Sequence, residues 1–328
     1  TDVRREQRLL AGGAHVVVGT PGRLCDHLER GVLDLRALRV VVLDEADEML
    51  DMGFRDELEA ILSRAPAERR TLLFSATLPR GIEDLAARYQ RNARRIAATA
   101  PEEAHRDIEY RLHAIAPRER EHAVVNVLRF HDAPRALVFC ATREGVARMQ
   151  ASLAERGFAA VALSGELGQG ERNRALQQLR DGAARVLVAT DVAARGLDLP
   201  EVGLVVHADL PFDASVLQHR SGRTGRAGRK GVAVLLVPAN RRRIAERLVR
   251  EAKVAPRWSE VPDAEAIATR DREALLRDVG AAVAEVDESD RELARALLAA
   301  DGAEAVAAAL VRRERAARPA PEELPLTA

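Results

Sequence analysis

Short runs of β-branched and aliphatic residues alternate with amphipathic stretches in two blocks of this chain, residues 14–98 and 108–237. Such alternation is typical of parallel strands that are joined by crossover helices. The chain has 328 residues, which is enough for two domains of ~150 residues each. The sequence therefore predicts an α/β protein with two parallel-sheet domains, residues 1–97 and 108–250.

Each predicted strand is a short apolar run. In the first block the runs cover residues 15–20, 39–44 and 71–75, with a weaker run at 95–97. In the second block they cover residues 108–115, 136–140, 159–163, 185–190, 204–207 and 232–237. Residues 98–107 are polar, include Pro101 and have neither a helical nor a strand period, so we expect an interdomain linker there.

The strand pattern ends near Asn240, and a helical period replaces it. Apolar residues then recur at helical spacing in two groups, which predicts a small all-α region over residues 251–317. The groups are Leu275, Leu276, Val279, Val283 and Val286, followed by Leu293, Leu297, Val306 and Leu310. Residues 318–328 contain several prolines and predict a linker or a frayed end.

Two apolar stripes in so short a helical region suggest a contact with another molecule. Such a region hides one stripe against its own helices more easily than both. We expect residues from about 261 to 315 to mediate homodimerisation, because closed two-fold pairing is the commonest outcome for such a surface. The alternative is a monomeric cap whose stripes pack on the second α/β domain.

Charge and cysteine content exclude several classes of protein. Lys+Arg and Asp+Glu both number 51, so the net charge is zero and any basic surface must be local. The two cysteines, Cys25 and Cys140, have no Cys or His at metal-ligand spacing, which excludes a disulfide framework or a zinc ribbon. No apolar run reaches the ~18 residues that a membrane span needs, and the first residues do not resemble a secretory leader. We expect a soluble, cytoplasmic protein that does not associate with membranes.

Acidic residues follow the run at 39–44 directly. The segment Asp44-Glu45-Ala46-Asp47 thus lies at the carboxyl end of a predicted buried strand, where open α/β sheets bind ligands. In a Walker-B arrangement the first Asp holds Mg²⁺ through water, and the adjacent Glu orients and deprotonates the attacking water. The alternative is an acidic first helical turn that the helix dipole favours.

Two further segments follow predicted strands. Ser75 and Thr77 place hydroxyl groups at the same sheet edge as Asp47, although capping hydroxyls after strands are common. The segment from Thr20 to Arg23 has Pro at a helix start and an Arg beside free backbone N–H groups, which suits a nucleic-acid phosphate. An ordinary αβ turn explains that segment equally well.

Residues 219–226 contain arginines at every third position, separated by glycines. We interpret this run as too flexible and too charged for a structural helix. Glycines allow close approach to a polyphosphate, and Arg binds its oxygens in a bidentate manner; the alternative is a solvated charge run. Residues 190–198 add Gly196 and the carboxylates of Asp191 and Asp198 after another predicted strand, with a helix cap as the alternative for Asp191 alone.

Taken together, these segments resemble the motifs of the DEAD-box RNA helicases over residues 1 to about 250. The segments that carry the resemblance occur in the family's order: residues 20–23, 44–47, 75–77, 139–142, 169–172, 189–198 and 219–226. The resemblance implies two RecA-like domains, the first incomplete, with ATP and Mg²⁺ as cofactors and RNA as the partner. It further implies RNA-dependent ATP hydrolysis, local duplex unwinding and sequence-independent contacts with the RNA backbone.

By motif position the resemblance also implies roles for single residues. Asp44 and Glu45 would act at Mg²⁺ and water, while Asp47, Ser75, Thr77 and His219 would couple the two domains. Arg223 and Arg226 would be arginine fingers, and Gly196 and Asp198 would lie near the nucleotide ribose. The residues implied at RNA phosphates are Thr20, Gly22, Arg23, Thr142, Arg143, Gln169, Arg172 and Thr190.

Two departures from the family pattern qualify the expected activity. No Gly-Lys-Ser/Thr phosphate loop occurs in the sequence, so we expect a chain truncated before that motif and unable to hydrolyse ATP alone. The region from Trp258 to about residue 315 is similar to the dimerisation region of bacterial cold-shock members, but their additional RNA-binding module is missing. The alternatives are a non-catalytic dimeric RNA-binding scaffold and, more remotely, a DNA helicase of the same superfamily.

Overall fold

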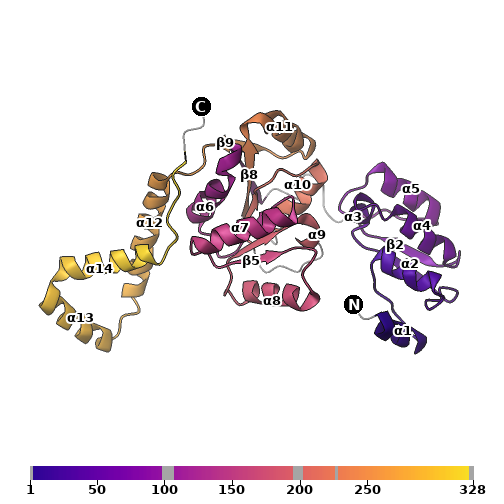
Figure 1. Cartoon of the computed structure of the whole chain (residues 1–328), viewed down its shortest axis with the longest axis horizontal. Helices are drawn as coiled ribbons and strands as arrows, with labels where there is room; N and C mark the ends of the chain where they lie inside the picture. The colour runs from indigo at the N-terminus through magenta and orange to yellow at the C-terminus, as the bar shows by residue number, and fades with distance from the viewer. Residues whose placement is uncertain (1–2, 98–106, 195–201, 226–227, 325–328) are drawn as a thin grey trace. The chain divides into compact units, whose positions relative to one another are not determined.

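The computed structural model describes residues 3–97, 107–194, 202–225 and 228–324. The chain divides into two compact units, Thr1–Ala98 and Thr99–Ala328. Almost all of the expected linker at 98–107 lies outside the described residues. Figure 1 shows the helices and strands of both units, coloured by position along the chain.

The first unit has two parallel strands and five helices in its described part. Strand β1 pairs with β2 in register, with Val40 opposite Arg70. Buried aliphatic side chains from both strands and three helices form its core, which includes Leu43, Leu58 and Ile82. The elements are α1 (Val3–Ala11), α2 (Pro21–Glu29), β1 (Val40–Leu43), α3 (Ala46–Asp51), α4 (Arg55–Arg64), β2 (Arg70–Leu73) and α5 (Arg80–Tyr89).

The predicted strands at residues 15–20 and 95–97 are wrong, because neither segment is a strand in the structure. Val18 is 93% exposed and Ile96 is 80% exposed, despite their strand-like sequence. A strand is stable only where a neighbouring strand accepts its backbone hydrogen bonds. In the described part of this unit β1 and β2 pair only with each other, so an apolar alternating pattern alone does not produce a strand there.

The second unit contains a seven-stranded sheet in the order β5-β6-β4-β7-β8-β3-β9. All its described pairings are parallel, which confirms the α/β class and the six strands predicted in this block. The strands are β3 (Ile108–Ile115), β4 (Ala136–Phe139), β5 (Ala160–Leu163), β6 (Val186–Ala189), β7 (Leu204–His207), β8 (Gly231–Pro238) and β9 (Pro256–Ser259).

Helices cover both faces of this sheet (Figure 1). Val138 and Val188 face α6 and α7, while Leu137 and Leu187 on the same strands face the opposite layer. Because both of their faces are buried, the central strands β4 and β6 consist of continuous apolar residues, which made them easy to predict. One layer contains α6 (Arg120–His131) and α7 (Arg143–Glu155); the other contains α8 (Gln169–Arg180), α9 (Asp191–Ala194), α10 (Ala214–Ser221) and α11 (Arg242–Glu251).

Strand β9 corrects the expectation that strands end near Asn240 and that an all-α region begins at 251. β9 pairs with β3, and Trp258 lies opposite Leu112 in register. The guanidinium of Arg242 lies 4.7 Å from the centre of the Trp258 ring. β9 begins with Pro256 and contains polar residues, which is typical of an edge strand. Such a strand shows little of the apolar pattern from which strands are predicted.

Helices α12 (Ala264–Val283), α13 (Glu288–Asp301) and α14 (Ala303–Ala316) confirm the predicted helical region, although Val286 lies outside them. In α12 only Ile267 is buried, and neither α13 nor α14 has a buried residue. Leu276 and Leu293 are 69% and 65% exposed. The two predicted apolar stripes are therefore largely open to solvent in the single chain.

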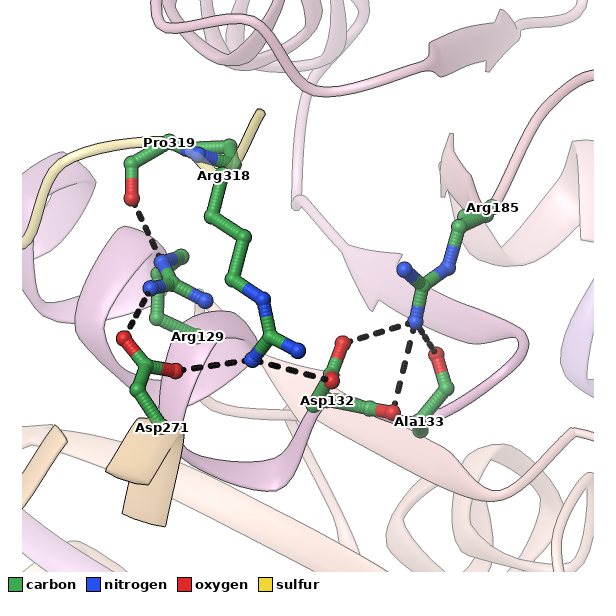
Figure 2. Close-up of polar contacts among 7 residues, drawn as sticks. All are labelled: Arg129, Asp132, Ala133, Arg185, Asp271, Arg318 and Pro319. Carbon is green, nitrogen blue, oxygen red and sulfur yellow. Dashed lines mark hydrogen bonds and ion pairs between the residues drawn. The ribbon is translucent and has the colours of Figure 1, made fainter. Parts of the chain in front are cut away.

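The C-terminal segment, residues 318–324, returns to α6. Arg129 of α6 is 6% exposed, and its guanidinium donates to Oδ2 of Asp271 in α12 over 2.7 Å and to the carbonyl oxygen of Pro319 over 2.5 Å. Arg318 donates to the other carboxylate oxygen of Asp271 over 2.9 Å (Figure 2). Residues 318–324 are therefore held against α6 and are not a frayed end, whereas the linker alternative stays a prediction.

Asn126, one turn earlier in α6, makes the second connection. Its side-chain amide donates to the carbonyl oxygens of Pro262 and Glu322 over 3.0 and 2.9 Å, and its side-chain oxygen accepts from the backbone N–H of Glu322 over 2.8 Å. Pro262 precedes α12, whereas Glu322 follows α14. Both ends of the helical region are therefore fastened to one helix of the α/β unit.

Candidate nucleotide and RNA sites

The first candidate group lies where β1 ends. Asp44 and Glu45 are both exposed and precede α3, which begins at Ala46. Glu45 has φ 51° and ψ 48°, in the left-handed region, and its backbone N–H donates to Oδ1 of Asp44 over 3.1 Å. This conformation costs a non-glycine residue about 1 kcal/mol, and such strain is concentrated at functional sites. The acidic first turn of α3 contains Asp47 and Glu48 instead.

The chemistry of this turn suits a hydrated magnesium ion. Exposed carboxylates at the carboxyl end of a parallel strand can hold Mg²⁺ through its bound water. Within the part of the chain that the structure describes, no group of three or more His, Cys, Asp or Glu side chains could hold a metal ion. A metal would therefore depend on Asp44, on water and on a bound ligand rather than on a protein cage.

Asp47, Ser75 and Thr77 form one hydrogen-bonded group between the loops that follow β1 and β2. The buried carboxylate of Asp47 accepts at Oδ2 from the backbone N–H and the hydroxyl of Thr77, over 2.8 and 2.7 Å. The Ser75 hydroxyl accepts from the backbone N–H of Asp47 over 3.2 Å and donates to the Thr77 carbonyl over 2.7 Å. The structure thus brings Asp47 together with two residues that follow it by 28 and 30 positions in the sequence.

The segment from Thr20 to Arg23 begins α2. Thr20 is the exposed N-cap residue, and its hydroxyl makes no capping hydrogen bond. Arg23 pairs with Glu6 of α1 over 2.8 Å, and His27 contacts the same carboxylate oxygen over 2.9 Å. Hydrogen bonds from His27 and then Arg23 hold the pKa of Glu6 below its usual value. The Glu6 carboxylate would therefore compete with an RNA phosphate for the guanidinium of Arg23.

In the second unit the predicted RNA-contacting residues lie at the carboxyl ends of β4, β5 and β6, which are neighbours in the sheet. Thr142 caps α7 by accepting from the N–H of Gly145 over 3.0 Å, and Arg143 pairs with exposed Glu166 over 2.5 Å. Gln169 begins α8, and Thr190 is a buried residue after β6. Arg172 donates to the carbonyl of Ala193 over 3.1 Å, which ties α8 to α9.

The arginine-rich run differs from its prediction in one respect. His219 and Arg220 lie in the last turn of α10, so the run begins inside a structural helix. Arg220 is only 3% exposed, because Asp191 neutralises its charge in the protein interior. Arg223 follows the helix and is partly exposed. Arg226, Gly196 and Asp198 lie outside the described residues.

Gly225 shows that the glycines of this run also serve packing. Its φ is +63°, and an added Cβ would lie 2.5 Å from a side-chain carbon of Ile108 and 3.1 Å from the carbonyl oxygen of Asp107. Only glycine meets both requirements at low cost. The glycine spacing predicts a backbone that comes close to a ligand, whereas at Gly225 the backbone lies close to Ile108 and Asp107 of the same chain.

Sequence reasoning missed Asp209 and the depth of Arg220. Asp209 follows β7 closely, and its carboxylate accepts from the N–H of Ala141 over 2.9 Å and from Arg120. The signal was available, since a carboxylate shortly after a predicted strand was the argument used for Asp44. The nearby thiol of Cys140 is buried, which raises its pKa to about 12 and makes it unreactive.

Comparisons with known proteins match this architecture. A DEAD/DEAH box helicase family model matches residues 1–85, and a helicase conserved C-terminal domain model matches residues 119–228. The chain belongs to the DEAD-box RNA helicase family. No helix in the described residues is long and apolar enough to span a membrane.

The chain is 43% identical over 236 residues to the DEAD-box ATP-dependent RNA helicase CshA of Geobacillus kaustophilus, covering 72% of this chain and 50% of the relative. It is 38% identical over 292 residues to the ATP-dependent RNA helicase DeaD of Klebsiella pneumoniae, covering 89% and 45% respectively. The chain thus spans about half the length of the curated relatives it matches. The solved structure of S. cerevisiae Dbp5 bound to RNA and ADP BeF3 is similar with a TM-score of 0.71 and 29% identity, covering 80% of this chain and 70% of that one.

Proposed function

We propose that this chain forms the larger part of the motor of an ATP-dependent RNA helicase that binds the RNA backbone and unwinds short duplexes locally. The observation that carries the proposal is the turn at Asp44 and Glu45, held at the carboxyl end of β1 in a chain that matches both helicase family models. The network of Asp47, Ser75 and Thr77 lies directly beside this turn. The names of the relatives, which are ATP-dependent RNA helicases, support the same activity.

In this proposal ATP with Mg²⁺ supplies the phosphoanhydride bond whose hydrolysis drives the cycle. Asp44 would hold water of the metal shell, and the Glu45 carboxylate would orient a water molecule and accept its proton. Arg223 and Arg226 would neutralise charge on the bound phosphates, and Gly196 and Asp198 would contact the nucleotide sugar. Asp47, Ser75, Thr77 and His219 transmit the state of the nucleotide between the two domains.

The RNA-binding edge of the second unit would contact phosphates without reading bases. Thr142, Arg143, Gln169, Arg172 and Thr190 follow adjacent strands or begin the next helix, so that hydroxyl, amide and guanidinium groups lie along one edge of the sheet. Thr20, Gly22 and Arg23 would add contacts from the first unit. Contacts of this kind give sequence-independent and salt-sensitive binding.

We further propose the domain assignment and a cytoplasmic location on the same basis. Residues 1–97 belong to the first RecA-like domain, with 98–107 as the linker, and the second RecA-like domain extends past residue 250 to include β9. The helical region α12 to α14 forms a homodimer interface, because its apolar residues, Leu276 and Leu293 among them, are exposed in the single chain.

Two measurements test the helicase proposal against the scaffold alternative. The purified chain should bind labelled RNAs of unrelated sequence with similar affinity and should release no phosphate from ATP, because its sequence has no phosphate loop. In a chain extended upstream with a Gly-Lys-Thr segment, RNA should stimulate phosphate release, and Glu45→Gln should abolish it while ATP binding persists. RNA binding with no hydrolysis in the extended chain would favour the scaffold.

Arg226→Ala in the extended chain provides an independent check. An arginine finger is worth about 10³-fold or more in kcat, so the variant should lose that much turnover with little change in ATP binding. An unchanged kcat would assign Arg226 to a structural role.

A further inference from the structure

Arg220 is buried and fully engaged by the protein itself. Its Nε and Nη2 donate to the two carboxylate oxygens of Asp191 over 2.5 and 2.7 Å, and its Nη1 donates to the carbonyl oxygen of Asp209 over 2.8 Å. The guanidinium carbon lies 5.0 Å from the centre of the Phe139 ring. With 3% of the residue exposed, this side chain cannot reach a phosphate without leaving all three partners.

The three partners belong to three neighbouring strands. Phe139 ends β4, Asp191 follows β6 and Asp209 follows β7, and the sheet order places β6, β4 and β7 side by side. Asp209 extends the connection, since its carboxylate accepts from the N–H of Ala141 in the loop after β4. One guanidinium in α10 therefore fixes the carboxyl ends of three adjacent strands relative to one another.

The loops that Arg220 fixes contain the residues proposed to contact RNA. Thr142 and Arg143 begin α7 just after the loop of β4, and Thr190 immediately precedes Asp191. Arg223 lies three positions beyond Arg220 on the segment that leaves α10. A movement of the Arg220 side chain would thus displace both the loops proposed to contact RNA and the segment that contains Arg223.

The chemistry of this contact requires arginine. A planar guanidinium can donate to both oxygens of a carboxylate, donate to a carbonyl at a fixed angle and stack on an aromatic ring at the same time. An ammonium group does not combine these contacts. Removing the charge of Asp191, whose side chain is 20% exposed, leaves the buried guanidinium of Arg220 without its counter-charge, which is costly in the protein interior.

We propose that Arg220 is a positioning residue for RNA binding, which holds the loops after β4 and β6 in one arrangement and does not itself contact phosphate. This inference rests on the proposed RNA binding of the chain. It differs from the interpretation of the arginine run as a set of phosphate ligands.

The sign of one substitution separates the two interpretations. Asp191→Asn removes a negative charge and one of the two oxygens that accept from the guanidinium, so an Arg220 that binds phosphate would become more available and RNA binding would tighten. A positioning Arg220 predicts the opposite: about tenfold weaker binding, or ~1.4 kcal/mol, despite the more positive charge. Arg220→Lys keeps the net charge and should weaken binding to a similar extent.

The assay is fluorescence anisotropy of a labelled oligouridine with the whole chain at fixed salt. The control is Arg185→Lys, because Arg185 also joins a carboxylate oxygen, Asp132 Oδ1, to a backbone carbonyl, that of Ala133, over 2.8 and 3.0 Å, but from a half-exposed side chain at the amino end of β6. The control should change the RNA affinity by less than about twofold. The double variant Asp191→Asn/Arg220→Lys should bind no more weakly than the worse single variant, because both remove one contact.

Hydrogen exchange of the free chain gives a readout that needs no RNA. Amides at residues 140–145 and 190–194 should exchange faster in Asp191→Asn and Arg220→Lys than in wild type, while those of α6 stay unchanged. Should the wild-type chain bind no RNA, the proposed function fails, and unchanged exchange in these loops would separately overturn the positioning role. Unchanged or tighter RNA binding by Asp191→Asn would overturn it directly.

Discussion

Arg129→Met tests whether the C-terminal segment fastens the helical region to the α/β unit. The substitution keeps an apolar stem of similar length in the buried site and removes the guanidinium. The variant loses the 2.7 Å contact with Asp271 and the 2.5 Å contact with the Pro319 carbonyl. Asp271 keeps its ion pair with Arg318 and remains partly exposed, so it is not left as an isolated buried charge.

The magnitude follows from these contacts. Each hydrogen bond to a charged group contributes about 1.5–3 kcal/mol to stability. Because Arg318 and water still interact with the charge of Asp271, we expect the free energy of unfolding to fall by about 2–3 kcal/mol, which is less than the sum of the two hydrogen-bond contributions. For a unit of this size that loss lowers Tm by about 5–10 °C.

The only tryptophan of the chain makes the measurement specific. Trp258 lies in β9, so its fluorescence reports unfolding of the second unit alone. Arg185→Met is the control, since Arg185 has a half-exposed side chain and its pair with Asp132 should contribute about 0–1 kcal/mol. If Arg129→Met unfolds within about 0.5 kcal/mol of the control, the C-terminal segment does not anchor the helical region.

Three further predictions follow from single sites. Burial, and to a smaller extent the nearby charges of Arg111 and Arg270, lower the pKa of His131 in the folded chain to about 4. Between pH ~6.5 and pH ~4 the unfolded chain therefore binds a proton on His131 that the folded chain does not bind. His131 therefore favours folding fully above pH ~6.5, and this contribution, at most about 3 kcal/mol, is lost as the pH falls; urea unfolding of His131→Asn should show a flatter pH dependence. Gly225→Ala should destabilise the second unit by about 1–3 kcal/mol, whereas Gly280→Ala, in an open helical position, should stabilise it by about 0.5–1 kcal/mol; equal effects in thermal unfolding would contradict the packing argument. Leu293→Lys with Leu297→Lys should convert a dimer to a monomer in sedimentation, and a wild-type chain that is already monomeric would refute the proposed interface.

How much of the fold the sequence reveals depends on burial. The runs that became β4 and β6 are apolar at every position because helices cover both of their faces, and this pattern indicates buried parallel strands. The run at 15–20 contains three consecutive valines, yet Val16 is 79% exposed, because a strand also needs a partner and no local pattern encodes one. β9 shows the reverse, since its tertiary partner β3 makes a strand of residues with little pattern.

The candidate site divides in a similar way. Positions after strands were predictable, so Asp44, Asp47, Ser75 and Thr77 lie at one sheet edge as expected. The left-handed turn at Glu45 was not, because no local rule places a glutamate there. Nor does spacing distinguish the buried Arg220 from Arg223, since the difference arises from Asp191, which comes from a distant strand.

The same chemical arrangement recurs at three places in the second unit. Arg220, Arg129 and Arg185 each join a carboxylate of one segment to a backbone carbonyl of the same or another segment. A guanidinium holds such acceptors at fixed angles, whereas an ammonium group is a mobile point charge. Arg→Lys should therefore lower the free energy of unfolding strongly at Arg220 and at Arg129, which are 3% and 6% exposed. The loss should be small at Arg185, whose side chain is 50% exposed. Equal losses at all three positions would mean that charge, rather than geometry, stabilises these contacts.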